Sequence, residues 1–261
     1  MAKVERRTTL QIWGDVIFAI FLREIRGKFN DKFGLSWALI SPMIMIVVMV
    51  AIRGALSGTE THGMPTIFFV LFGVVLVQFF LGIVEKSSSS IQKNKPLYAF
   101  RQVQPISSLI AISGFELLTK CFLVALLGLI GYFIQIEISI DDPLEIILIS
   151  MRVWLIATSL GLLFSLAKCY VQEVAKIQQL ITRPIFFISG IFFSLQDIPM
   201  EYWKYLTWNP LLHAVELARF AAYPQYGSAG VSYFYLDICT LVITFFALAC
   251  YQISWKQAIS R

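Results

Sequence analysis

Six long apolar runs dominate this sequence and limit what it can fold into. An apolar helix needs about 20 residues to cross about 30 Å of membrane hydrocarbon, and each run is near that length. With 58% hydrophobic and 14% charged residues, the chain has more apolar surface than one soluble core would cover. The sequence therefore predicts an all-α integral membrane protein with six transmembrane helices, near residues 35–55, 66–84, 106–134, 145–167, 177–193 and 233–255.

The distribution of charge predicts how these helices cross the membrane. Residues 1–34 hold seven Lys or Arg and residues 85–105 hold four, whereas the connection 135–144 has acidic residues and no Lys or Arg. Because connections on the cytoplasmic side are enriched in Lys and Arg, we expect both termini in the cytoplasm. The net charge of +5 follows from this orientation, so we do not expect nucleic-acid binding.

Residues 1–34 are predicted to form a cytoplasmic N-terminus with one amphipathic helix along the inner membrane surface. Apolar side chains recur there at spacings of three and four, which places them on one helical face: Leu10, Trp13, Ile17, Phe21 and Ile25. Three cations near the end of this helix either anchor it to lipid headgroups or meet a phosphate or carboxylate of a substrate: Arg23, Arg26 and Lys28. Residues 35–255 then form the six-helix transmembrane domain, and 256–261 a cytoplasmic tail.

A polar segment, residues 85–105, separates the second and third apolar runs. Leu97, Tyr98 and Phe100 give it a short helix with an apolar edge, and Arg101 follows them. We interpret the segment as the cytoplasmic contact through which another protein moves the membrane-embedded chain. These four residues are predicted to form that contact. We call it the coupling segment.

Ionised residues inside the predicted spans are candidates for a substrate path, because charges at membrane depth face the bundle interior, an interface or water. Glu116 and Lys120 lie four residues apart on one face, either as a structural ion pair or as a contact for cargo. Arg152 either snorkels outward or lines a passage for an anionic polymer. Arg183 precedes Pro184, which is expected to kink the fifth span, and lies near enough to the cytoplasm to reach it.

Residues 194–232 form an outer connection that is too long for a plain loop and is rich in aromatic side chains. Asn209-Pro210 has the N-cap and first-turn proline of a new helix, so we expect short re-entrant helices in this region. The aromatic residues either form a belt at the membrane interface or stack on sugar rings. The candidates for such stacking are Tyr202, Trp203 and Trp208.

The sequence lacks the motifs of a catalyst. It has no G-x-S-x-G, H-E-x-x-H or G-x-x-x-x-G-K-[ST] pattern, and no cluster of polar residues at one membrane depth that would suit a membrane-embedded transferase. His213 and Glu216 are three residues apart, which is too few ligands for a metal site and favours a local hydrogen bond. We therefore expect no catalytic site, metal or cofactor, and a separate motor protein if transport is uphill.

Three stretches carry a family resemblance: FLREIRGKFNDKFGLSWALISPM (21–43), PLYAFRQVQPISSLIA (96–111) and FFISGIFFSLQDIPMEYWKYLTWNPLLHAVELARFAAYPQYG (186–227). Together they resemble permease subunits of ABC-2-type exporters, specifically the branch that exports capsular polysaccharide. The first stretch is similar to the family's entry helix, the second to its coupling region and the third to its fifth span and re-entrant helices. The first stretch also adds Trp37 to the candidate substrate-binding residues.

The resemblance implies a type V exporter fold and a homodimer joined to two separate ABC ATPase subunits, which bind the ATP. A lipid-linked polysaccharide would enter at the cytoplasmic face of the bacterial inner membrane. Such permeases work with a periplasmic co-polymerase and an outer-membrane polysaccharide exporter. The alternative is the same architecture with O-antigen, teichoic acid or a small hydrophobic compound as substrate.

Overall fold

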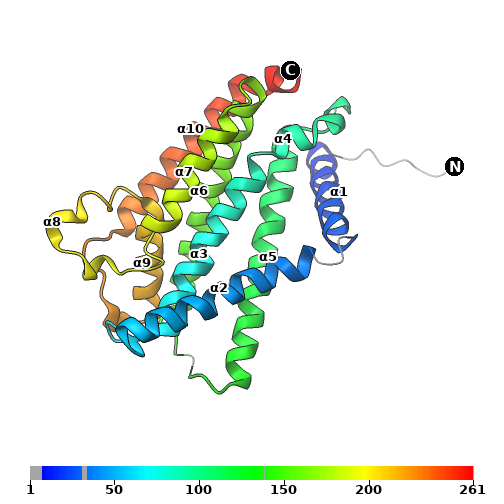
Figure 1. The fold of residues 1–261 in the computed structure, drawn as a ribbon. Coiled ribbons are helices and arrows are strands. Elements are labelled where there is room, and N and C mark those ends of the chain that lie inside the picture. The colour runs from blue at the N-terminus through cyan, green and yellow to red at the C-terminus, as the bar shows by residue number, and fades with distance from the viewer. Residues whose placement is uncertain (1–7, 31–33, 101, 138, 261) are drawn as a thin grey trace.

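The computed structural model describes residues 8–30, 34–100, 102–137 and 139–260. They form a bundle of helices with one pair of two-residue strands (Figure 1). The longer helices are α1 (Thr9–Asn30), α2 (Gly34–Ser57), α3 (Thr66–Ser87), α5 (Pro105–Phe133), α6 (Pro143–Tyr170), α7 (Val174–Ile188), α9 (Pro210–Ala222) and α10 (Tyr233–Ser260). The short elements are β1 (Glu60–Thr61), β2 (Met64–Pro65), α4 (Ser90–Lys93), η1 (Lys95–Ala99), η2 (Leu195–Asp197), α8 (Met200–Trp203) and η3 (Pro224–Tyr226).

Five of the described helices are long and apolar enough to cross a membrane: Ser36–Leu56, Thr66–Ser87, Pro105–Phe133, Pro143–Tyr170 and Tyr233–Ile259. Their limits agree with five of the six predicted spans to within a few residues. The remaining span, 177–193, corresponds to α7, which has 15 residues and covers only about 22 Å. The chain turns soon after α7, at Gly190, where φ is +77°. The described helices thus account for five crossings, and the sixth stays a prediction.

Helix α3 occupies the centre of the bundle and contacts α2, α5, α6, α7 and α9 (Figure 1). It is apolar nearly all round, as a helix surrounded by other helices should be. Its last turn approaches α6 very closely: a Cβ atom added to Gly161 would lie 2.4 Å from the Cβ of Ser87. Glycine is required at this contact because a larger residue would force the two helices apart.

The two ends of the bundle differ in structure. Helix α4 and the C-terminal end of α10 lie at one end, which we call the coupling end (Figure 1). Strands β1 and β2 pair antiparallel at the other end, which we call the hairpin end. Their turn places His62 and Gly63 at φ of +50° and +75°, which is typical of a two-residue hairpin turn. The all-α prediction missed this strand pair.

Several predicted helix starts are confirmed. Helix α5 begins at Pro105, the last residue of the coupling segment and one residue before the predicted start. Helix α9 begins at Pro210, and the side chain of Asn209 caps it by accepting a hydrogen bond from the Leu211 backbone N–H at 3.0 Å. Helix α1 packs along α5, where the Phe21 and Phe115 rings meet edge to face.

Candidate functional site

The coupling segment folds onto the end of α6. The Ser165 hydroxyl accepts a hydrogen bond from the Ile91 backbone N–H at 3.2 Å, and the Ile91 side chain is buried. Gln92 donates from its side chain to the Lys168 carbonyl oxygen at 3.0 Å. The brief helix predicted here exists as two short pieces, α4 and η1. The segment is therefore an ordered part of the bundle.

The predicted contact residues within this segment point in different directions. Tyr98 is buried, and its hydroxyl lies 2.6 Å from the Ser108 hydroxyl; burial raises the pKa of Tyr98 to about 12. Leu97 is half-buried, whereas Phe100 is 66% exposed. Tyr98 thus fastens the segment to α5, whereas the Phe100 side chain stays exposed. The predicted contact residue Arg101 lies outside the described residues.

Two side-chain pairs join α1 to the coupling segment. Lys93 Nζ lies 2.9 Å from Glu24 Oε2, and Arg23 donates a hydrogen bond to the side-chain oxygen of Asn94. Arg26 is exposed and makes no hydrogen bond or ion pair with another described residue. Arg23, predicted as an anchor or a substrate contact, is therefore engaged within the protein.

A groove of about 450 Å³ near the coupling end brings together four of the predicted substrate-binding residues, and we call it the Lys120 groove. The four predicted residues are Lys28, Trp37, Glu116 and Lys120. They come from α1, α2 and α5, and α3 adds Glu85 and Lys86. Trp37 is 64% exposed, so most of its ring is open.

The ion pair in this groove differs from the predicted one. Glu116 is 3% exposed and accepts a hydrogen bond from Lys86 of α3. Its expected partner, Lys120, lies one helical turn away and has no ion pair with another described residue. Lys86 takes the carboxylate because it reaches Glu116 across the α3–α5 contact. Among the described residues, two cations of the groove, Lys28 and Lys120, therefore have no ion pair.

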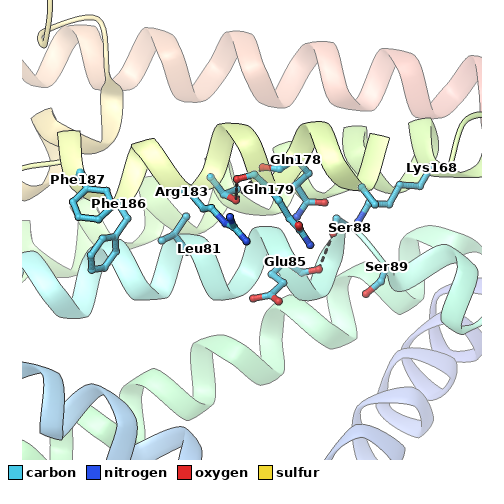
Figure 2. Close-up of a pocket in the computed structure, with 12 residues that line it drawn as sticks. Leu81, Glu85, Ser88, Ser89, Lys168, Gln178, Gln179, Arg183, Phe186 and Phe187 are labelled. Atoms are coloured by element: carbon cyan, nitrogen blue, oxygen red, sulfur yellow. Dashed lines mark hydrogen bonds between the residues drawn. The ribbon is translucent and has the colours of Figure 1, made fainter. Parts of the chain in front are cut away.

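A second hollow lies on the α7 side of α3 and holds about 670 Å³ (Figure 2). Leu81, Glu85 and Phe186 line both hollows, so the two are neighbours. We call it the Gln178 cavity. Its polar lining is Glu85, Ser88, Ser89, Lys168, Gln178, Gln179, Thr182 and Arg183. The structure thus places the predicted residue Arg183 here, apart from the Lys120 groove.

Arg152 of α6 lies away from both hollows. Its Nη1 is 3.0 Å from Glu145 Oε1, and its Nε is 2.5 Å from Asp237 Oδ1 on α10. Two carboxylates therefore neutralise this guanidinium and connect α6 to α10. This structural pairing was not predicted for Arg152, and its two predicted roles, snorkelling outward or lining a passage for an anionic polymer, stay predictions.

The predicted aromatic residues of the outer connection are spread over its surface. Tyr202 and Trp208 are exposed. Trp203 donates its indole N–H to the Ile198 carbonyl at 2.7 Å, and its ring packs so closely on Gly230 that a Cβ there would meet it at 2.6 Å. Trp208 donates to the Tyr205 carbonyl at 2.8 Å. None of the three lines either hollow.

Sequence reasoning missed a buried cluster around Arg219, which we call the Arg219 cluster. Arg219 is fully buried, with its guanidinium 3.5 Å from the centre of the Phe69 ring. It donates to the carbonyl oxygens of Phe69 and Gly190 at 3.0 and 2.7 Å, and pairs with Glu216 at 2.9 Å. The Tyr226 hydroxyl donates to the same Glu216 at 2.9 Å. The spacing of Glu216 and Arg219, three apart in a helix, was the available signal.

The expected hydrogen bond between His213 and Glu216 is wrong, because Arg219 and Tyr226 occupy Glu216. The two ring nitrogens of His213 instead lie 2.8 Å from the Thr207 carbonyl and 3.1 Å from the Ser232 backbone N–H. His213, on α9, thereby connects the turn after α8 to the residue that precedes α10.

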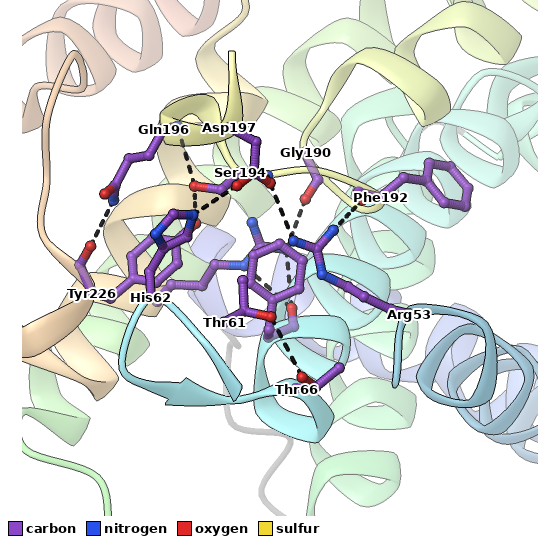
Figure 3. A network of polar contacts seen from close by, with 12 residues as sticks. Arg53, Thr61, His62, Thr66, Gly190, Phe192, Ser194, Gln196, Asp197 and Tyr226 are labelled. Atoms are coloured by element: carbon purple, nitrogen blue, oxygen red, sulfur yellow. Dashed lines mark hydrogen bonds and ion pairs between the residues drawn. The ribbon is translucent and has the colours of Figure 1, made fainter. Parts of the chain in front are cut away.

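An exposed set of contacts continues this cluster at the hairpin end (Figure 3). Asp197 contacts Arg53 at 3.2 Å and His62 at 2.7 Å. Burial of Asp197 opposes ionisation, but hydrogen bonds from the Ser194 backbone N–H, His62 and Arg53 outweigh it, so the pKa of this carboxyl lies below its usual value. The hairpin is thereby tied to the start of the outer connection.

These features define a multi-pass helical membrane protein with an ordered polar segment at one end and a charged groove near it. Comparison with known families gives its class: the ABC-2 type transporter model matches residues 15–223. The chain belongs to this family.

Curated relatives match over nearly their whole length. The "Polysialic acid transport protein KpsM" of Escherichia coli is 33% identical over 94% of this chain and 96% of that protein. The "Capsule polysaccharide export inner-membrane protein CtrC" of Neisseria meningitidis serogroup B is 25% identical, over 92% of this chain and 91% of its own. The "Capsule polysaccharide export inner-membrane protein BexB" of Haemophilus influenzae is also 25% identical, over 87% and 85%.

Proposed function

We propose that this chain is the transmembrane permease subunit of an ABC exporter that moves lipid-linked capsular polysaccharide across the bacterial inner membrane. The observation that carries the proposal is its similarity to KpsM along 94% of the chain, together with membership of the ABC-2 family. The names of CtrC and BexB give the same substrate class and the same membrane.

The energy for export comes from a separate ATPase subunit, which binds and hydrolyses the ATP, and this chain has no catalytic site of its own. The exposed Phe100 side chain, on a segment held by Tyr98 and Ser165, supports a contact with that subunit. Aromatic side chains that become buried when two proteins bind supply much of the binding energy in many interfaces. The coupling end accordingly faces the cytoplasm, and both termini lie on that side.

The substrate first meets the permease in the Lys120 groove. Lys28 and Lys120 supply positive charge for a phosphate or carboxylate, and Lys120 is not committed to an ion pair with another described residue. The exposed Trp37 ring provides an apolar face beside these cations. A groove with these contents suits an amphiphile that has an anionic head.

The remaining architecture follows the predicted family pattern. Helix α7 and the residues after it complete a sixth crossing, and α8 and α9 are the re-entrant helices of the outer connection. Two copies of the chain form the permease. They work with a periplasmic co-polymerase and an outer-membrane polysaccharide exporter.

A clean deletion strain tests the proposal. It should lose surface capsule, accumulate polymer inside the cell and recover when the wild-type chain is supplied. Normal surface capsule in the deletion strain would contradict the proposal. If O-antigen, teichoic acid or resistance to a small hydrophobic compound were lost instead, the substrate would be the alternative one. Purified with its ATPase, the permease should also change the rate of ATP hydrolysis when lipid-linked polymer is added.

A further inference from the structure

The Gln178 cavity contains a buried polar group without a partner. Gln178 is 5% exposed, and its side-chain oxygen Oε1 has no hydrogen bond within the described part of the chain. Nearly all buried polar atoms in proteins are hydrogen-bonded, because an unpaired one has lost its water without compensation. Gln178 lines the cavity, so a rotation of its side-chain amide would bring the buried Oε1 to a ligand that donates the missing hydrogen bond.

The charges of the cavity favour a ligand with an acidic group. Arg183 and Lys168 contribute two positive charges against one negative charge from Glu85. Lys168 Nζ donates to the Ser88 hydroxyl at 2.8 Å, whereas Arg183 is exposed and has no ion pair with another described residue. A guanidinium offers paired N–H donors that match a carboxylate or phosphate in two places. Arg183 is therefore the group that would recognise such an anion.

The end of the cavity farthest from Lys168 is aromatic (Figure 2). The Phe187 ring stacks on Phe192 with centroids 5.7 Å apart, and Phe186 meets Phe187 edge to face at 5.3 Å. A rigid aromatic face beside hydrogen-bonding groups suits the C–H face of a sugar ring. A wholly apolar ligand fits less well, because it would remove water from Arg183 and leave Gln178 unpaired.

We propose that the Gln178 cavity is a saccharide-binding site for an acidic sugar residue of the exported polymer. Gln178 Oε1 accepts a hydrogen bond from a sugar hydroxyl, Arg183 pairs with the acidic group, and Phe186 and Phe187 pack against the ring. The assignment rests on the proposed function, since a glycan exporter is what brings sugars to this end of the bundle. Under this assignment the sugar binds in the Gln178 cavity and not in the neighbouring Lys120 groove.

Binding of two defined probes tests the assignment. The permease–ATPase complex in lipid nanodiscs is titrated by calorimetry with tetragalacturonate, which carries carboxylates, and with neutral maltotetraose. Tetragalacturonate should bind about tenfold more tightly, and Arg183→Gln should abolish this difference. Gln178→Leu should weaken both probes by about tenfold. Equal affinity of the wild type for both probes, or affinities unchanged in the two variants, would overturn the assignment.

Two controls separate binding from folding. Gln178→Leu replaces a buried amide, whose oxygen has no hydrogen bond among the described residues, with an apolar side chain of similar size. The thermal stability of the ligand-free complex should therefore stay the same or rise. A fall in stability that accompanies the loss of binding would make Gln178 a structural residue and overturn its assigned role. Lys204→Gln removes a cation from α8's C-cap, outside both hollows, and should bind both probes as the wild type does.

Complementation in cells distinguishes this inference from the proposed function. If the deletion strain lacks capsule but the Gln178→Leu and Arg183→Gln variants restore it fully, the cavity assignment fails and the function stands. If the deletion strain keeps its capsule, the proposed function itself fails. Loss of capsule with both variants, at normal protein abundance, supports the two together.

Discussion

Arg23 of α1 donates a hydrogen bond to the side-chain oxygen of Asn94, between α4 and η1. Its neighbouring pair, Lys93 with Glu24 at 2.9 Å, links the same two elements. Helix α1 is therefore attached to the coupling segment, and we expect movement of one to carry the other. Such exposed pairs contribute little to overall stability, which makes their role in transmission testable.

Charge reversal at Arg23 should separate transmission from membrane anchoring. We expect Arg23→Glu to lower export about fivefold, the effect of about 1 kcal/mol, because it repels Glu24 and loses Asn94. Arg26→Glu is the matched control, since it changes the same charge three residues away without breaking a described contact. Both are assayed for surface polymer and for permease abundance in the membrane. If both variants lose export only as far as their abundance in the membrane falls, these cations would be assigned to anchoring alone.

Phe100 should carry the contact with the ATPase. Phe100→Asp places a charge on an exposed aromatic anchor, so co-purification of the ATPase should fall about tenfold or more while the permease stays in the membrane. Gln102→Asp adds the same charge to a nearby exposed position and should retain the partner. Retention of the ATPase by Phe100→Asp would remove this side chain from the interface.

Lys120, which has no ion pair with another described residue, should contribute its positive charge to export. Lys120→Gln keeps a polar side chain but removes the charge that would meet an anionic head, so we expect export to fall about fivefold at unchanged abundance. Lys256→Gln, near the C-terminus, removes a cation outside the groove and should export normally. Normal export by Lys120→Gln would mean that the groove does not bind the anionic group through this residue.

The contact between α3 and α6 should reject even a methyl group. Gly161→Ala would bring its Cβ to 2.4 Å from that of Ser87, and we expect a loss of about 1–3 kcal/mol in thermal unfolding of the purified protein. Gly114→Ala is the control, because nothing lies within 4 Å of its added Cβ. Adding Ser87→Gly to Gly161→Ala should recover much of the stability. A stable Gly161→Ala protein would contradict the observed approach of the helices.

Asp197 should make the hairpin end sensitive to acid. Because the pKa of Asp197 is lowered in the folded protein, the stability that it contributes is complete above its unfolded value of about 3.9 and is lost as pH falls through the folded pKa. Wild type should therefore resist heat better than Asp197→Asn at pH 6, and the difference should shrink as the pH falls through this lowered pKa. A difference that persists undiminished in acid would exclude this carboxylate as its source.

The apolar runs predicted the five long apolar helices, because the length and polarity of a membrane helix are local properties. They do not report which helices touch. Three findings depend on contacts between elements that sequence periodicity does not reveal. Glu116 pairs with Lys86 and not with Lys120. Tyr98 turns inward, and Arg183 lies apart from the Lys120 groove. Helix α7 is shorter than predicted for the same reason. The apolar sequence continues past Gly190, where the backbone turns.

The Arg219 cluster also has a mechanical consequence. It fixes α3 at Phe69, whereas the coupling segment begins near Ser87, about 27 Å farther along the same helix. A helix held at one point and pushed at a distant one behaves as a lever, with Phe69 at its pivot. Tilting this lever by about 10° would shift its far end, near Ser87, by about 5 Å, which is enough to alter the hollows that it lines.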